Sequence, residues 1–76
     1  MKNKYYILAA QNRIKDLSFK LENNGFKESL VQTIVMYNNF IYQLRDDYII
    51  YDNKTIKNIK KDLKHIAKEI KKGGWF

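Results

Sequence analysis

The chain has 76 residues, and its 15 lysines and arginines against 8 aspartates and glutamates give a formal net charge of +7 at pH 7. This length allows one small domain over 1–76, and the absence of cysteine excludes disulfides and cysteine-ligated metal sites. The first apolar run is too short for a signal peptide, and no stretch approaches the ~20 apolar residues of a membrane span, so we expect a cytoplasmic protein.

A regular spacing of aliphatic residues predicts a first helix over about 4–23. Intervals of three and four residues separate Ile7, Ala10, Ile14, Leu17 and Leu21. This spacing places all of them on one face of an α-helix, as in helices that pack on a core. We expect the helix to end at Asn23-Asn24-Gly25, because glycine readily adopts the left-handed conformation that follows many helices.

The segment 27–53 is compatible with two different structures. As a second helix, it would bury a stripe with intervals of four and three residues, formed by Leu30, Ile34, Tyr37, Ile41 and Leu44. As a sheet, it would form three strands at about 30–37, 40–45 and 48–51, because it is rich in β-branched and aromatic residues. The polar pairs between these strands would then be two-residue hairpin turns, although neither pair contains glycine.

The strands are favoured by the way their side chains sort between two faces. Two-residue turns place Tyr37 opposite Phe40 and Arg45 opposite Tyr48. One face of the sheet is then almost entirely apolar, as a core requires, and the other is mixed. We therefore predict an α+β fold, in the order helix, three-stranded antiparallel meander, helix. An all-α three-helix bundle is the alternative.

The clearest helical pattern predicts a last helix over about 55–72. Its aliphatic stripe, with intervals of three and four residues, consists of Ile56, Ile59, Leu63, Ile66 and Ile70. Thr55 is the expected N-cap, and Gly73 is expected to end the helix. The tail, 73–76, contains Trp75 and Phe76, which either cap the core or anchor a partner.

The polar side of this last helix is divided by charge. At about 100° per residue, one sector of about 120° contains only lysines. These are Lys57, Lys60, Lys61, Lys64, Lys68, Lys71 and Lys72. Residues 54–76 carry eight basic and two acidic side chains, a net charge of +6, whereas residues 30–53 carry one and three, a net charge of −2. Such a basic end predicts an anionic partner that approaches from one side. Enrichment in lysine for solubility alone is the competing interpretation.

No residue pattern in the chain indicates catalysis. His65 is the only histidine, and Asp62 and Glu69 beside it on the helix are expected to form surface ion pairs with it. The serine and threonine hydroxyls lack a recognisable base, and the three glycines form no phosphate-binding loop. We therefore predict a protein that is not an enzyme and that uses no metal, cofactor or small-molecule substrate.

The first functional hypothesis is a small basic protein that contacts nucleic acid or a nucleoprotein complex through its last helix. The lysines would neutralise phosphates and release counterions, with little reading of base sequence. Lys2, Lys4 and Arg13 would add contacts to the same partner.

The second hypothesis is a protein inhibitor that binds a host protein. Small, cysteine-free chains of this kind are common in phages and mobile elements, where they act against host defence, as anti-CRISPR proteins do. The predicted protein-binding residues are Ile34, Met36, Ile41, Tyr48, Trp75 and Phe76. Binding to a membrane surface through the last helix ranks below both hypotheses, because a small domain needs that helix's apolar stripe for its core.

Overall fold

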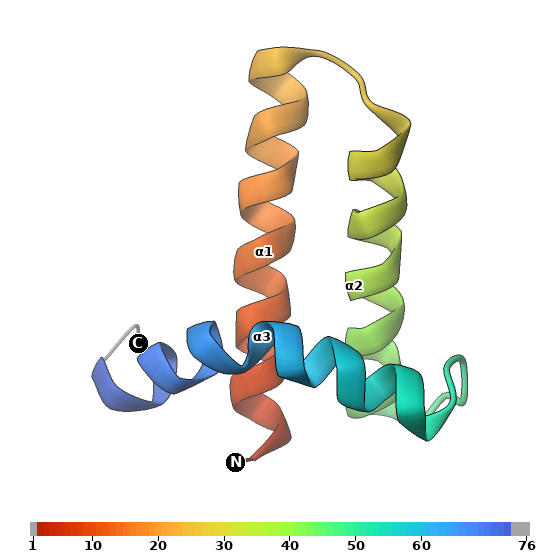
Figure 1. Ribbon diagram of the computed structural model, residues 1–76, viewed down its shortest axis with the longest axis vertical. Coiled ribbons are helices and arrows are strands. Elements are labelled where there is room, and N and C mark those ends of the chain that lie inside the picture. The colour runs from red at the N-terminus through yellow and green to blue at the C-terminus, as the bar shows by residue number, and fades with distance from the viewer. Residues whose placement is uncertain (1, 74–76) are drawn as a thin grey trace.

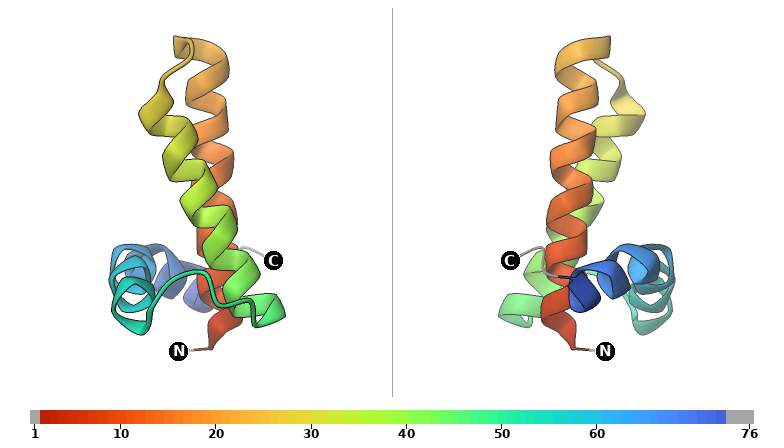
Figure 2. Two further views of the ribbon diagram at one scale, coloured as in Figure 1. Left: turned by 90° about the vertical axis from the view of Figure 1, so that its right-hand side faces the viewer. Right: turned by 90° about the vertical axis from the view of Figure 1, so that its left-hand side faces the viewer.

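The computed structural model describes residues 2–73, which form three α-helices: α1 (Asn3–Asn24), α2 (Glu28–Asp46) and α3 (Asn53–Gly73). α1 and α2 pack side by side as an antiparallel hairpin, and α3 crosses this hairpin near the start of α1 and the end of α2 (Figure 1). α3 lies on one side of the hairpin, whose far end projects beyond it as a two-helix arm (Figure 2). None of the helices in residues 2–73 combines the length and apolar character that a membrane crossing requires.

The predicted α+β fold is wrong, and the alternative, an all-helical bundle, is the observed architecture. Residues 2–73 contain no strand. The segments predicted as the first two strands, 30–37 and 40–45, lie within α2, and 48–51 lies in the irregular loop before α3. The helices predicted over 4–23 and 55–72 are confirmed as α1 and α3.

α2 is helical because one of its sides contributes to a core shared with the other two helices. Tyr37, Phe40 and Ile41 are buried in that core. The β-branched residues that suggested strands fit this helix: Val35 is half exposed, and the Thr33 hydroxyl donates to the Ser29 carbonyl at 2.8 Å. A β-branched residue costs a helix only about 0.5 kcal/mol, whereas burial of a large apolar side chain contributes roughly 2 kcal/mol. Burial therefore decides the structure of this segment.

The two polar pairs that suggested hairpin turns have other positions. Asn38 and Asn39 lie in the middle of α2, where Asn38 is exposed. Asp46 is the last residue of α2, and Asp47 follows it in the left-handed conformation, with φ 58° and ψ 23°. Aspartate tolerates this conformation better than most residues, so the second pair marks the end of a helix.

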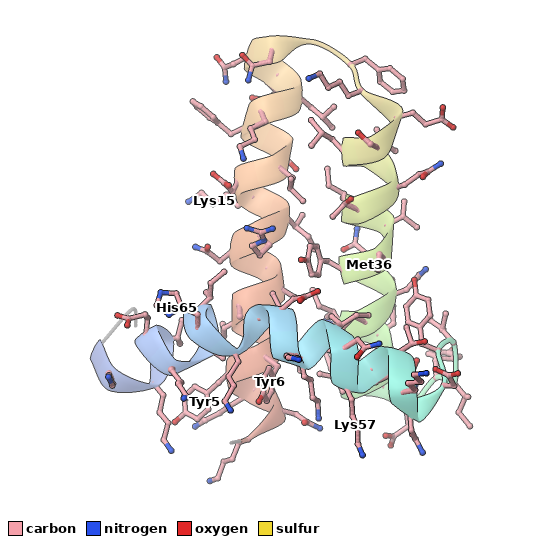
Figure 3. The ribbon with its side chains drawn as sticks, in the orientation of Figure 1. Tyr5, Tyr6, Lys15, Met36, Lys57 and His65 are labelled. Carbon is pink, nitrogen blue, oxygen red and sulfur yellow. The ribbon has the colours of Figure 1, made fainter. Side chains whose placement is uncertain are left out.

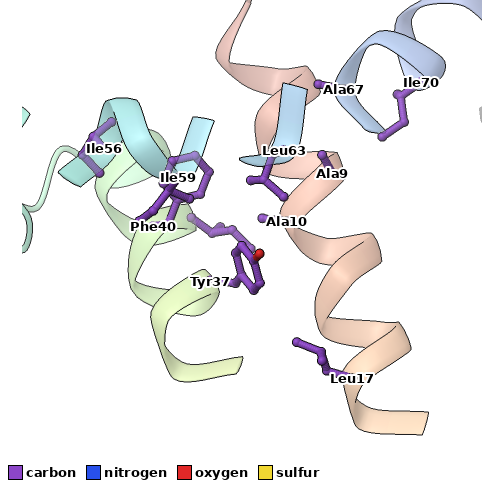
Figure 4. Packing of buried hydrophobic residues seen from close by; sticks show 11 residues of the cluster. Ala9, Ala10, Leu17, Tyr37, Phe40, Ile56, Ile59, Leu63, Ala67 and Ile70 are labelled. Atoms are coloured by element: carbon purple, nitrogen blue, oxygen red, sulfur yellow. The ribbon is translucent and has the colours of Figure 1, made fainter. Parts of the chain in front are cut away.

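The crossing of α1 and α3 is built from small side chains. Ala9 and Ala10 of α1 and Ala67 of α3 have no exposed surface, and neither has Leu63 (Figure 4). The distance between two packed helices depends on the side chains at their contact, so alanines allow the two helices to approach closely. Phe40 of α2 belongs to the same buried cluster, which therefore joins all three helices.

The loop between α2 and α3 is held by the side chain of Gln43. Its Oε1 accepts hydrogen bonds from the N–H groups of Ile50 and Tyr51 at 3.0 and 2.7 Å. Its Nε2 donates to the Tyr51 carbonyl at 2.8 Å. One glutamine on α2 thus supplies partners for three backbone groups of a loop that has no regular structure of its own.

Replacing Gln43 by alanine should lower the free energy of unfolding by about 1–3 kcal/mol, because the backbone groups of Ile50 and Tyr51 lose their partners. Urea unfolding followed by circular dichroism measures this change. The control Gln32→Ala, on the exposed surface of the same helix, should change it by less than about 0.5 kcal/mol. Equal losses in the two variants would contradict the role assigned to Gln43.

α3 begins with an N-cap one turn earlier than the sequence suggested. The Asp52 carboxylate accepts a hydrogen bond from the Thr55 N–H at 2.8 Å, so Asp52 is the capping residue and Thr55 is its partner. The pKa of Asp52 lies below its ordinary value, because the Thr55 hydroxyl and then the Thr55 N–H bond to the ionised form.

Because folding lowers the pKa of Asp52, ionised Asp52 stabilises the protein above its unfolded-state pKa, and this contribution is lost as the pH falls through the folded-state value. Asp52→Asn provides a cap that does not titrate. The difference in free energy of unfolding between wild type and this variant should therefore shrink from neutral pH to below the ordinary value of 3.8. Chemical denaturation at several pH values measures it, and a constant difference would contradict the assignment.

Candidate nucleic-acid interface

α3 presents three kinds of surface around its axis. Its buried side consists of Ile56, Ile59, Leu63, Ala67 and Ile70. In Figure 3 Lys57 points toward the end of the molecule where α1 begins, whereas His65 points to the other side, toward the arm. Because the core fixes the rotation of α3 about its axis, the lysine-rich side has a defined direction in the folded protein.

Six of the seven predicted lysines are exposed on this side, and we refer to these six as the lysine face. They are Lys57, Lys61, Lys64, Lys68, Lys71 and Lys72. The ion pairs within residues 2–73 join Lys20 to Asp16 and Arg45 to Asp46, so no lysine of the lysine face is ion-paired with an acidic side chain in this range. It extends roughly 22 Å along the helix at 1.5 Å per residue.

Lys60 has a different position from the other six lysines. It is partly buried, its Nζ donates to the Asn3 side-chain carbonyl at 3.1 Å, and it lies 5.3 Å from the centre of the Tyr6 ring. Both contacts are made to the first turns of α1. Lys60 thus binds α3 to α1, and we remove it from the set of candidate phosphate contacts.

The start of α1 adds positive charge beside the lysine face. Lys2 and Lys4 are exposed, and the first turn of α1 contains no acidic residue. The N-terminal end of a helix also carries a partial positive charge from its backbone dipoles. Arg13, in contrast, is partly buried, with its guanidinium 6.0 Å from the centre of the Tyr37 ring on the hairpin, so it does not extend this surface.

The opposite flank of α3 carries the histidine and the two acidic residues of this helix. His65, Asp62 and Glu69 are exposed, and residues 2–73 contain no cluster of three or more potential ligands. The ion pairs predicted between His65 and its two acidic neighbours are not formed in this part of the chain.

Within residues 2–73, the predicted protein-binding residues do not form one exposed surface, because this part of the chain does not contain the predicted sheet. Ile41 is buried, and Ile34 and Met36 pack against the core. Tyr48 is exposed in the loop before α3. Trp75 and Phe76 lie outside the described residues.

Two features of the site were missed by the sequence reasoning. The contact of Lys60 with Asn3 joins residues 57 positions apart and depends on the angle at which the helices cross. The second feature is the group of exposed apolar side chains around Ile49, which the sequence predicted to be part of a strand. The two aspartates just before residue 48, and the lack of alternating polar residues from 48 to 51, were the signal that this segment is a loop.

No known family model, curated protein or solved structure matches this chain. The site and its chemistry therefore have to support any functional proposal.

Lys60→Ala should lower the free energy of unfolding by about 1 kcal/mol, because the hydrogen bond to Asn3 and the contact with the Tyr6 ring are lost. Lys61→Ala removes the same chemical group from the next position and should change it by less than about 0.5 kcal/mol. Lysine and alanine both favour helix, so helix propensity does not separate the variants. Thermal unfolding measures both, and equal stabilities would contradict the assignment.

Proposed function

We propose that this protein binds nucleic acid through the lysine face of α3 and acts on the phosphate backbone rather than on the bases. The observation that carries the proposal is a row of six exposed lysines, unpaired with acidic side chains of residues 2–73, on one side of a helix whose opposite side is fixed in the core. Each lysine that meets a phosphate releases condensed counterions, which is the main source of sequence-independent affinity.

The composition of the lysine face favours this backbone contact. It contains no arginine, which is the usual side chain for bidentate recognition of guanine. Nor does α3 place an aromatic side chain among these lysines for stacking on an unpaired base. Binding with little sequence preference is the expected result, with the exposed Lys2 and Lys4 at the start of α1 adding to the local positive charge.

A membrane surface fits the same charges less well. Amphipathic helices that bind membranes insert their apolar side among the lipids. In this protein the apolar side of α3 is buried against the hairpin, so its insertion would require the core to open.

Charge-reversal variants distinguish DNA binding by the lysine face from general attraction by the net charge of the protein. The triple variant Lys57→Glu, Lys61→Glu and Lys64→Glu lowers the net charge by two per substitution, from +7 to +1. The matched triple Lys15→Glu, Lys20→Glu and Lys27→Glu makes the same change on α1 and the arm. We expect the first triple to weaken binding of a labelled DNA duplex more than about tenfold and the second less than about threefold.

Fluorescence anisotropy at several salt concentrations provides the readout. If all six lysines contact phosphates, the logarithm of the binding constant should fall with the logarithm of salt concentration with a slope of about −5, and the first triple should flatten that slope. Equal losses in the two triples would show that net charge, not the lysine face, attracts the DNA. No binding of DNA or RNA duplexes at low salt would reject the proposed function.

A further inference from the structure

The loop before α3 and the end of α2 expose four large apolar or aromatic side chains that the lysine face does not use. These are Tyr42, Tyr48, Ile49 and Ile50, which we call the loop patch. Ile49 is the extreme case, with 92% of its surface exposed, while the other three are exposed by 45–61%. Contiguous exposed apolar surface of this kind is typical of an interaction site.

The loop patch is held in a defined shape. The rings of Tyr42 and Tyr48 pack edge to face with their centres 6.4 Å apart, and the Arg45 guanidinium lies 5.6 Å from the Tyr42 ring. The backbone of Ile50 is hydrogen-bonded to Gln43. A surface that is ordered before binding loses less conformational entropy when a partner arrives.

The charges around the loop patch favour a second copy of this chain as the partner. Residues 42–54 contain two basic and three acidic side chains, a net charge of −1, in a molecule of net charge +7. Two copies that meet at their loop patches therefore repel each other less than two copies that meet at their lysine faces. Arg45 is paired with Asp46 of its own chain at 3.2 Å, so its positive charge is already balanced at this surface.

The shape of the same region is also self-complementary. Ile49 itself lines an open hollow of about 250 Å³. The other lining residues are apolar or aromatic on one side and polar on the other: Leu44, Tyr48 and Ile56, and Asn3, Gln43, Asp47 and Asn53. In a two-fold arrangement, Ile49 of each copy can enter the hollow of the other. The four exposed side chains offer roughly 500 Å² per copy, so a dimer would bury at most about 1,000 Å², within the range of weak, transient interfaces.

We propose that two copies of this protein associate through their loop patches into a weak, two-fold symmetric dimer, with Ile49 of each seated in the other's hollow. This proposal does not depend on nucleic-acid binding, because the loop patch and the lysine face share no residue.

Sedimentation velocity from about 1 to about 500 µM tests the proposal over the range expected for a small interface. The wild-type protein should shift from monomer to dimer, and Ile49→Asp should remain monomeric, because the interface would bury two uncompensated carboxylates. Phe26→Asp is the matched control: Phe26 is 78% exposed and lies in the loop between α1 and α2, at the opposite end of the hairpin. The Phe26→Asp variant should dimerise as the wild type does.

Two results would overturn the proposal. The first is a wild-type protein that stays monomeric throughout, which would assign the loop patch to a different partner. The second is an equal loss of dimer in both variants, which would indicate association through general apolar exposure. As a separate readout, Ile49→Cys in this cysteine-free chain should form a disulfide-linked dimer at least about tenfold faster than Phe26→Cys, and equal rates would exclude the two-fold contact.

Discussion

The close contact of α3 with α1 is the constraint on which the rest of the structure depends. Ala9 and Ala10 on one helix and Ala67 on the other remove the side-chain bulk that would keep the helices apart, and Leu63 fills the core beside them. A larger residue at any of these fully buried alanines would overpack the contact and destabilise it. Since α3 has few contacts with α2, this crossing also determines which way the lysine face points.

Burial at the crossing also explains how a helix with this much charge of one sign is stable. Lysines four residues apart repel each other by a few tenths of a kcal/mol per pair in an isolated helix. The four buried isoleucine and leucine side chains of α3 contribute roughly 2 kcal/mol each by comparison, so the core easily outweighs the repulsion. The protein therefore has no structural need for acidic residues among the lysines, and the positive charge of the face remains available to an external anion.

The sequence predicted α1 and α3 well because each has a single aliphatic stripe at helical spacing and a clear end signal, with Gly25 after α1. It failed for α2 because β-branched and aromatic residues have similar preferences for a strand and for a buried helix side. Phe40, the most buried residue of α2, did not belong to the stripe considered for the helix alternative. The sector of lysines followed from spacing alone. The contact of Lys60 with Asn3 could not be predicted from the sequence, because it depends on how two distant segments cross.

The separation of charge along the chain gives the two proposed surfaces compatible positions. The loop patch lies before the first turn of α3, in a segment of slight negative charge, and the lysine face runs from there toward the other end of the helix. A dimer formed at the loop patch would leave most of each lysine face uncovered. Two lysine faces in one particle would bind a long duplex more tightly than one, because the second contact forms at the high effective concentration set by the first. Even a weak dimer would therefore be favoured on nucleic acid, where local protein concentration is high. The two surfaces would then act together although they share no residue.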